Sequence, residues 1–381
     1  MIDIAIKLKF ILPLPLSVAM ILLLVACSAG IESSSSPAST ATSAPTHTPT
    51  EAPPTAMPIL APVPLPSSGI KLISDKEAVC NNGDRATYVV HMNDDPSDKW
   101  FVYFEGGGSA HNSDQYRSRI KQNNGYLVKP ADNANANAGA IGEHMLELGY
   151  NTVFVHYCSS DVYQGDHYHE IDGKKVPFKG RIIVSGVIDD LRIELNAASD
   201  IIFAGSSAGS VALGFNADLF AQFGNSRVLS DGWWSDTRRQ EWRLSDPSPV
   251  QALSFLFKNP PDHCGNTDVP VAEKSSRCLP NRQLLNDFGI DDVFVIWNLG
   301  DPYNRMIGDK SGVAEAIRAD LTAYGAGFSI DVDKNAIEGF DGHVMTTRQR
   351  LYNHRFDNGI TLRQLVGNWV NGLGNSLYIG Y

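Results

Sequence analysis

The chain alternates between two patterns of apolar and polar positions, one typical of buried strands and one of amphipathic helices. Runs rich in β-branched and aromatic residues occupy 88–92, 99–106, 151–158, 200–205, 291–300 and 328–333. Apolar positions at helical spacing fill 140–150, 180–198, 210–224, 312–327 and 360–373. Strands that are apolar on both faces and alternate with helices are typical of a mostly parallel sheet covered by helices on both faces. We therefore predict an α/β fold in a single domain, residues 69–381, with an irregular insertion around 235–285.

Residues 1–68 follow neither pattern. Residues 1–26 contain two lysines, an apolar run and small residues before Cys27, which is the organisation of a secretory signal. The tetrapeptide LVAC resembles a bacterial lipobox, whose cysteine becomes the lipidated first residue, so we expect a lipoprotein signal peptide. An uncleaved membrane anchor is the alternative. Residues 27–68 are rich in Ser, Thr, Ala and Pro, which favours a disordered tether, so we expect an exported protein held at the cell surface through Cys27.

Charge and cysteine content narrow the possible partners. The formal net charge is −11, and this acidic balance argues against binding nucleic acid or docking electrostatically on anionic lipid. Four cysteines remain after Cys27, and an even number in an exported chain favours two disulfides. Cys264 and Cys278 close a short loop, which leaves Cys80 to pair with Cys158. No two of them have the CxxC spacing of a zinc site, so we expect no metal and no cofactor. We also expect a monomer.

The stretch AGSSAGS, residues 204–210, lies between a predicted strand and a predicted helix. The frame G-x-S-x-G fits only once, and it selects Ser207 as a nucleophile while excluding Ser206 and Ser210. A nucleophile on a sharp strand-to-helix turn needs neighbours without bulk, which the two glycines provide. The following helix directs its N-terminal dipole at any developing anion. A simple glycine-serine turn is the alternative interpretation.

A second glycine cluster follows the predicted strand at 99–106, in the sequence FVYFEGGGSAHN. Three glycines there place backbone N–H groups in a loop that can approach a ligand closely. In α/β-hydrolases a loop of this kind, commonly HGGG, donates half of the oxyanion hole, although here Glu105 replaces the histidine. A P-loop is excluded because no GK[ST] follows. A flexible turn is the alternative.

A serine nucleophile also needs a base and an orienting carboxylate, which in this fold follow in the order Ser, Asp, His. Among the histidines after Ser207, His343 follows the last predicted strand, whereas His263 lies in the insertion and His354 in a basic run. Asp301 comes just after the run 291–300, at the carboxyl end of a strand, where sites in parallel sheets collect. The acids that compete with it are Asp291, Asp292, Asp331, Asp333 and Asp341.

Five stretches in order resemble the pectin acetylesterase/Notum family of carboxylesterases. They are CNNGDRATYVVHMN, YFEGGG, VHYCSSDVYQGDH, GSSAGS and LSDGWW, which lie between residues 80 and 236. The resemblance implies an α/β-hydrolase fold and metal-free ester hydrolysis by the three residues Ser207, Asp301 and His343. It also implies that the oxyanion is held by backbone N–H groups, those of Gly107 or Gly108 and Ala208.

The chain departs from the family pattern just after the loop glycines. The family usually has an aromatic residue and a cysteine there, where this chain has Ser109 and Ala110. The departure removes one disulfide and one aromatic wall, so it bears on the rigidity of the loop and on the shape of the substrate. The acid region LGDPYN is also looser than the pattern of the plant members.

Two further clusters suggest ligand contacts. Trp233 and Trp234 are candidates for stacking on sugar rings, with core packing as the alternative for at least one of them. The run HYHE, residues 167–170, has the spacing of half a metal site but no convincing third ligand, so we expect surface or pocket-rim residues.

Four functions fit these observations to different degrees. The first is an exported serine esterase that removes acyl groups, acetyl above all, from carbohydrate. The alternatives are a carbohydrate-binding lipoprotein without turnover, a lipid-deacylating esterase and a peptidase with the same triad. Candidates for all three triad positions in the expected order favour the first, because a binding protein has no need of them.

Overall fold

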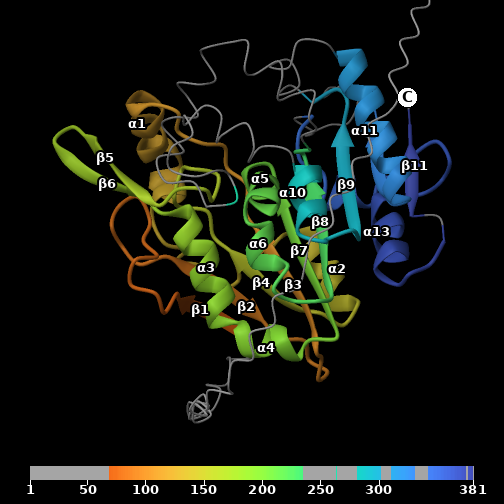
Figure 1. The fold of residues 1–381 in the computed structure, drawn as a ribbon, viewed down its shortest axis with the longest axis horizontal. Helices are drawn as coiled ribbons and strands as arrows, with labels where there is room; N and C mark the ends of the chain where they lie inside the picture. The colour runs from red at the N-terminus through yellow and green to blue at the C-terminus, as the bar shows by residue number, and fades with distance from the viewer. Residues whose placement is uncertain are drawn as a thin grey trace, which may run out of the picture. The chain divides into compact units, whose positions relative to one another are not determined.

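Parallel strands dominate the central sheet of the protein (Figure 1). The computed structural model describes residues 68–234, 263, 281–301, 310–330, 342–374 and 376–380. The strands of the central sheet are β1 (Ser68–Leu72), β2 (Thr87–His91), β3 (Lys99–Phe104), β4 (Asn151–Val155), β7 (Asp200–Ser206), β8 (Ser226–Asp231), β9 (Val293–Asn298), β10 (Gly327–Ile330) and β11 (Leu377–Ile379). Their order in space is β1-β2-β4-β3-β7-β8-β9-β10-β11. A separate antiparallel hairpin is formed by β5 (His167–Ile171) and β6 (Lys174–Phe178).

The pairing confirms the predicted mostly parallel sheet and adds an antiparallel edge. From β4 through β3, β7, β8, β9 and β10 to β11, every neighbouring pair is parallel. Only the pairs β1–β2 and β2–β4 are antiparallel. Each of the six predicted apolar runs contains a strand. The half-exposed strand β1, the short strand β11 and the strand β8, in which four of six residues are polar, were not predicted.

Helices form in most of the segments predicted from helical spacing, and the described residues contain further helices besides. They are α1 (Ser113–Lys121), η1 (Gln122–Val128), α2 (Ala140–Glu147), α3 (Gly180–Asp190), α4 (Arg192–Ala197), α5 (Ala208–Phe215), α6 (Ala217–Phe220), α10 (Asn281–Asp287), α11 (Lys310–Tyr324), α12 (Gln349–Tyr352) and α13 (Leu362–Val370). The segment 210–224 is two helices, because the side chain of Asn216 donates to the carbonyls of Ala212 and Tyr163 where α5 ends. In the described part of the chain, no helix is long and apolar enough to span a membrane.

Two apolar clusters cover the two faces of the sheet, as strand alternation requires. Along β3, Val102 and Phe104 contribute to one cluster and Phe101 and Tyr103 to the other. The first cluster packs under α3, α5, α10 and α11, and the second under α2, α12 and α13. These helices therefore confirm the prediction of a sheet covered on both faces, within the one compact unit Ala61–Tyr381.

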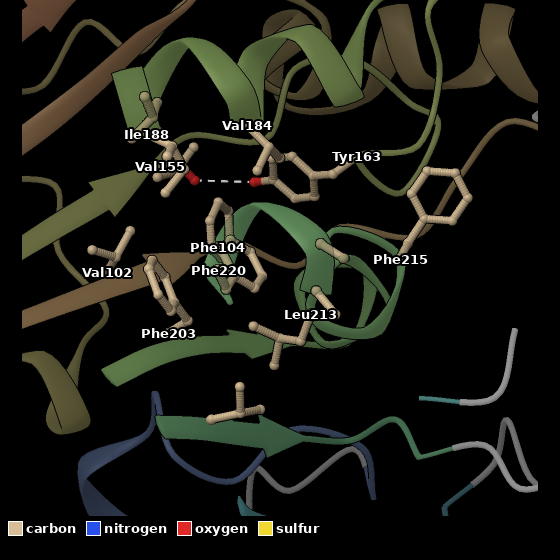
Figure 2. Close-up of a cluster of buried hydrophobic side chains, with 14 of the residues drawn as sticks. Val102, Phe104, Val155, Tyr163, Val184, Ile188, Phe203, Leu213, Phe215 and Phe220 are labelled. Carbon is tan, nitrogen blue, oxygen red and sulfur yellow. Dashed lines mark hydrogen bonds between the residues drawn. The ribbon is translucent and has the colours of Figure 1, made fainter. Parts of the chain in front are cut away.

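Figure 2 shows the first cluster, where aromatic rings fix the distance between the sheet and its helices. The rings of Phe203 on β7 and Phe220 on α6 stack with centroids 4.2 Å apart. Phe104 touches both Phe220 and Tyr163, and the hydroxyl of Tyr163 donates to the carbonyl of Val155 at 3.0 Å. The carboxyl ends of β3 and β7 are thus held in a rigid apolar setting.

A disulfide joins Cys80 to Cys158, which confirms the predicted pairing. Both residues are fully buried, and Cys158 lies three residues past the end of β4. Cys27, Cys264 and Cys278 lie outside the described residues. The disulfide ties the segment before β2 to the loop that follows β4.

Replacement of the disulfide by Cys80→Ser and Cys158→Ser together is expected to lower the melting temperature. The link spans 78 residues, and the loss of so large a closed loop costs about 4 kcal/mol in the chain-entropy model. Thermal unfolding followed by circular dichroism measures the effect, with the single variants as controls for exposure of a free thiol. An unchanged melting temperature in the double variant would show that the disulfide does not stabilise the fold.

Candidate active site

The turn between β7 and α5 is sharp and leaves no room for side chains on either side of Ser207. A Cβ atom on Gly205 would lie 2.4 Å from the backbone of Gly209, and one on Gly209 would lie 1.9 Å from the carbonyl oxygen of Phe104. Ser207 itself has φ 52° and ψ −113°, which is costly for a residue with a side chain. The two glycines of G-x-S-x-G are therefore steric requirements of this turn.

The neighbouring serines have structural partners. The Oγ of Ser206 accepts a hydrogen bond from the Tyr103 hydroxyl at 2.7 Å, and the residue is buried. The Oγ of Ser210 lies 2.6 and 2.8 Å from the carbonyl oxygens of Gly205 and Asp231. Ser207 is half-buried and lines a cavity, so its hydroxyl is the accessible one, as the glycine frame predicted.

His343 lies between Ser207 and Asp301 and touches both. Its Nε2 is 2.7 Å from the Oγ of Ser207, and its Nδ1 is 2.6 Å from Oδ2 of Asp301. Asp301 is only 2% exposed and follows β9, with its N–H donating to the carbonyl of Asn298. The Asn298 side chain in turn donates to the carbonyl of Gly342, beside His343. The structure thus brings together the three residues selected from the sequence.

The competing histidines and acids within the described residues lie elsewhere. His263 packs its ring against Phe215 and Phe288, and His354 is exposed. Asp292 accepts hydrogen bonds from Arg227 and Trp369 at the opposite end of β9, and Asp291 is exposed beside it. The other three candidates lie outside the described residues: Asp331, Asp333 and Asp341.

Asp231, at the end of β8, connects the serine turn to the histidine loop. Its carbonyl accepts from the N–H of Ser207 at 2.8 Å. Its Oδ2 accepts from the N–H groups of Met345 and Thr346 and from the Thr346 hydroxyl, at 2.9, 2.8 and 2.7 Å. Burial raises the pKa of this carboxyl to about 6, against the opposing effect of those hydrogen bonds and of His343. Sequence reasoning missed Asp231, although it stands in the quoted LSDGWW.

The glycine loop after β3 lies against the serine turn. A Cβ atom on Gly106 would lie 3.1 Å from the Cβ of Ser207. Gly107 and Gly108 have φ of +152° and +67°, values that favour glycine. Neither N–H of these two makes a hydrogen bond with a described residue. Ala208 is the first residue of α5, so its N–H has no partner within the helix.

Glu105 holds the base of this loop and is a second residue whose role the sequence did not reveal. Its Oε2 lies 2.7 Å from Nδ1 of His156 and accepts from the N–H of Tyr157, and its Oε1 accepts from the Tyr126 hydroxyl. The Nε2 of His156 faces the carbonyls of Tyr126 and Lys129, each at 3.0 Å. Both ring nitrogens of His156 thus face oxygen atoms of the segments that flank the loop.

A cavity of about 640 Å³ opens above Ser207 and His343. Three asparagines, Asn133, Asn135 and Asn137, are among the residues that line it. Arg348 adds a cation to the lining. The alternating run NANANA at 133–138 carries these asparagines, and the sequence analysis did not predict their place at the cavity.

The prediction that Trp234 binds substrate is wrong. Its side chain is fully buried in the first apolar cluster, and its Nε1 donates to Asp320 on α11 at 2.8 Å. Trp233 is half-buried against the same cluster, and neither indole lines the cavity. A large ring gains most from complete burial when its N–H finds an acceptor inside, as Trp234 does.

The HYHE run is also placed differently from the expectation of surface or rim residues. His167 and His169 are buried on β5, with their Nε2 atoms 3.0 Å apart and both rings packed against Phe178. In the part of the chain that the structure describes, no group of three or more His, Cys, Asp or Glu side chains could hold a metal ion.

Comparison with known proteins agrees with the geometry. Residues 65–240 match the family model of pectinacetylesterases. The chain is 30% identical over 199 residues to palmitoleoyl-protein carboxylesterase notum1 of Xenopus laevis, covering 48% of this chain and 39% of that protein. It is 27% identical over 186 residues to NOTUM of Homo sapiens, covering 45% and 37%, so it spans less than half the length of these two relatives.

A plant relative matches over a longer stretch. Pectin acetylesterase 11 of Arabidopsis thaliana is 25% identical over 259 residues, covering 65% of this chain and 66% of that protein. The region matched by the family model includes the end of β8, and also the glycine loop and the serine turn, both of which line the cavity. The mostly parallel sheet, the family model matched by residues 65–240 and these relatives together support the pectin acetylesterase/Notum family for the matched part of the chain.

Proposed function

We propose that the protein is a serine carboxylesterase with Ser207 as nucleophile, His343 as base and Asp301 as the orienting acid. The observation that carries the proposal is the continuous line of hydrogen bonds from Asp301 through His343 to Ser207, with lengths of 2.6 and 2.7 Å. The names of the relatives, carboxylesterase and acetylesterase, support the same class of reaction. A protein that only binds carbohydrate has no use for this arrangement.

In the proposed reaction, His343 takes the proton of Ser207 as its Oγ attacks the ester carbonyl carbon. Asp301 fixes the tautomer and stabilises the imidazolium that forms. The oxyanion of the tetrahedral intermediate accepts hydrogen bonds from Ala208 N–H and from Gly107 or Gly108 N–H. The alcohol leaves with the proton from His343, and a water activated by the same histidine then hydrolyses the acyl-enzyme, which releases the acid and restores Ser207.

The lining of the cavity supports a short acyl group on a polar alcohol. The carboxamides of Asn133, Asn135 and Asn137 offer both donors and acceptors, the kind of partner that sugar hydroxyls take. A long hydrocarbon chain instead requires a predominantly apolar wall. We therefore favour acetyl esters of carbohydrate over lipid esters, although several relatives are named palmitoleoyl-protein carboxylesterase.

We further propose that the enzyme works outside the cytoplasm, anchored to a membrane through a lipid on Cys27. The buried disulfide Cys80–Cys158 supports export, because disulfides persist in oxidising compartments. The lipobox-like LVAC sequence supports the anchor. Cys27 and residues 28–67 of the tether lie outside the described residues, whereas Ser68 is the first residue of β1.

Ser207→Ala is expected to abolish turnover of p-nitrophenyl acetate, with a fall in kcat of about 10³-fold or more, because Ser207 is the serine of this turn whose hydroxyl contacts His343. Ser206→Ala is the matched control. It removes only an acceptor of Tyr103 and should keep most of the activity. Equal losses in both variants, with unchanged circular dichroism, would refute the assignment of the nucleophile.

Asp301→Asn is expected to lower kcat by about 10²- to 10⁴-fold while the protein stays folded, because an amide favours the wrong tautomer of His343. Asp341→Asn, two residues before the base, is the control and should stay within a few-fold of wild type. Steady-state kinetics on p-nitrophenyl acetate measures both variants. The reverse ranking would identify Asp341 as the acid.

Turnover is expected to fall as the acyl chain lengthens from acetyl to octanoyl, because a longer hydrocarbon chain would have to lie against polar lining residues such as Asn133, Asn135 and Asn137. The ratio kcat/KM across a series of p-nitrophenyl esters measures this preference, with and without EDTA to test for a metal requirement. A ratio that rises with chain length would favour a lipid-deacylating enzyme instead.

A further inference from the structure

Arg119 is a buried cation next to the glycine loop. It lies on α1, and only 6% of its surface is exposed. It makes no ion pair with any residue that the structure describes, and its Nη2 has no hydrogen-bond partner among them. A buried charge without a counter-ion is costly to stability, so its presence here points to a use other than packing.

The neutral partners of Arg119 identify what it holds. Its Nη1 donates to the carbonyl oxygen of Gly107 at 2.6 Å, and its Nε donates to the Oγ of Ser160 at 2.8 Å. The guanidinium also lies over the ring of Tyr157, 5.4 Å from the ring centroid. The Nε side of the guanidinium is therefore bound to Ser160, and its Nη1 is bound to the glycine loop.

The grip on Gly107 determines the direction of the next N–H group. The peptide between Gly107 and Gly108 is trans, so the Gly107 carbonyl and the Gly108 N–H point in opposite directions. Both glycines line the cavity, whereas Arg119 is not part of the lining. A carbonyl drawn toward Arg119 thus turns the N–H of Gly108 away from it, to the side of the cavity and Ser207.

We propose that Arg119 is the positioning residue of the oxyanion hole: it fixes the Gly107–Gly108 peptide so that the Gly108 N–H donates to the oxyanion. The proposal rests on the esterase function proposed above and names which of the two candidate N–H groups acts. The charge adds to the effect, because a cation on the carbonyl polarises the peptide and strengthens its N–H as a donor.

The contacts around Ser160 explain why Arg119 is a firm support. The Oγ of Ser160 donates to Oδ1 of Asn81 at 2.5 Å, and its carbonyl accepts from the N–H of Ala110 at 2.8 Å. Asn81 follows Cys80, and Ser160 lies two residues past Cys158, so the disulfide joins the two sides of this support. Where the family usually has a cysteine after the loop glycines, this chain anchors Ala110 and Gly107 through Ser160 and Arg119 instead.

The test compares Arg119→Met with Arg119→Lys and with Arg117→Met, a control two residues away on the same helix. Arg117 is more exposed and pairs with Asp114 and Asp172, away from the loop. The measurements are kcat and KM on p-nitrophenyl acetate and the inhibition constant of a trifluoromethyl ketone, which forms a tetrahedral oxyanion on the nucleophilic serine.

Arg119→Met is expected to lower kcat by about 10- to 100-fold, less than the loss of a whole oxyanion donor, and to leave KM nearly unchanged. The inhibitor should weaken by a similar factor, because it and the transition state depend on the same N–H. Arg119→Lys, which keeps the charge and one donor, should recover part of both losses, and Arg117→Met should lose neither. These outcomes separate positioning from a merely structural role, which would not move the inhibition constant in step with kcat.

A normal kcat in Arg119→Met, or a lowered kcat with an unchanged inhibition constant, overturns the proposal. If Arg119→Met does not fold by circular dichroism, the neutral Arg119→Gln decides by the same pair of measurements. Labelling of wild-type Ser207 by a fluorophosphonate tests the esterase function by itself. If the wild type labels while the Arg119 variants lose nothing, only this inference fails, whereas a wild type that neither labels nor turns over ester overturns both.

Discussion

The whole site depends on the close approach of the β7–α5 turn to the end of β3. The Cα atoms of Gly205 and Gly209 allow the backbone to fold back on itself and against Phe104, at distances that no side chain permits. Ser207 is thereby held at a positive φ, a conformation that costs about 1–3 kcal/mol and persists only where its surroundings enforce it. The aromatic contacts of Phe104 and Phe220 under the turn provide that enforcement.

The histidine loop, which carries His343, Met345 and Thr346, is tied to the same turn by Asp231, at some cost to stability. A carboxylate with three donors on one oxygen is well held, yet its Oδ1 is buried without a hydrogen-bond partner among the described residues. Because burial raises the pKa to about 6, the native state binds more protons than the unfolded chain between 3.8 and about 6. The contribution of this group to stability therefore falls as the pH rises through that interval. The ionised group is retained where it fixes the distance between nucleophile and base.

The third part of the site, the glycine loop, is supported from behind by α1 and by the segment after β4. Glu105 binds His156 and Tyr126 at the base of the loop, and Arg119 binds its carbonyl at Gly107. Both of these supports depend on residues near Cys158, which the disulfide links to Cys80. The proposed nucleophile, the proposed base and the glycine loop thus come from three separate segments, and each is fixed by polar contacts to a buried scaffold rather than by its own local structure.

The sequence by itself determined the class of fold, the glycine-framed serine and the order in which acid and base follow it. Continuous apolar runs and helical spacing are local properties, so the central strands and most helices could be predicted from them. The edge strands β1 and β11 could not, because their half-exposed residues carry no clear apolar signal. β8 could not be predicted either, because only Val228 and Leu229 of its six residues are apolar.

Only the tertiary structure decided which polar residues support the site. Arg119, Asp231 and Glu105 look like ordinary charged residues in the sequence, since their partners lie between 12 and 115 residues away along the chain. Trp234 is the converse case. Its aromatic side chain suggested stacking on a sugar ring, but in the structure it is buried against Tyr324 and Asp320. Local patterns report what a segment can form, whereas the role of a polar or aromatic side chain depends on neighbours that only folding brings together.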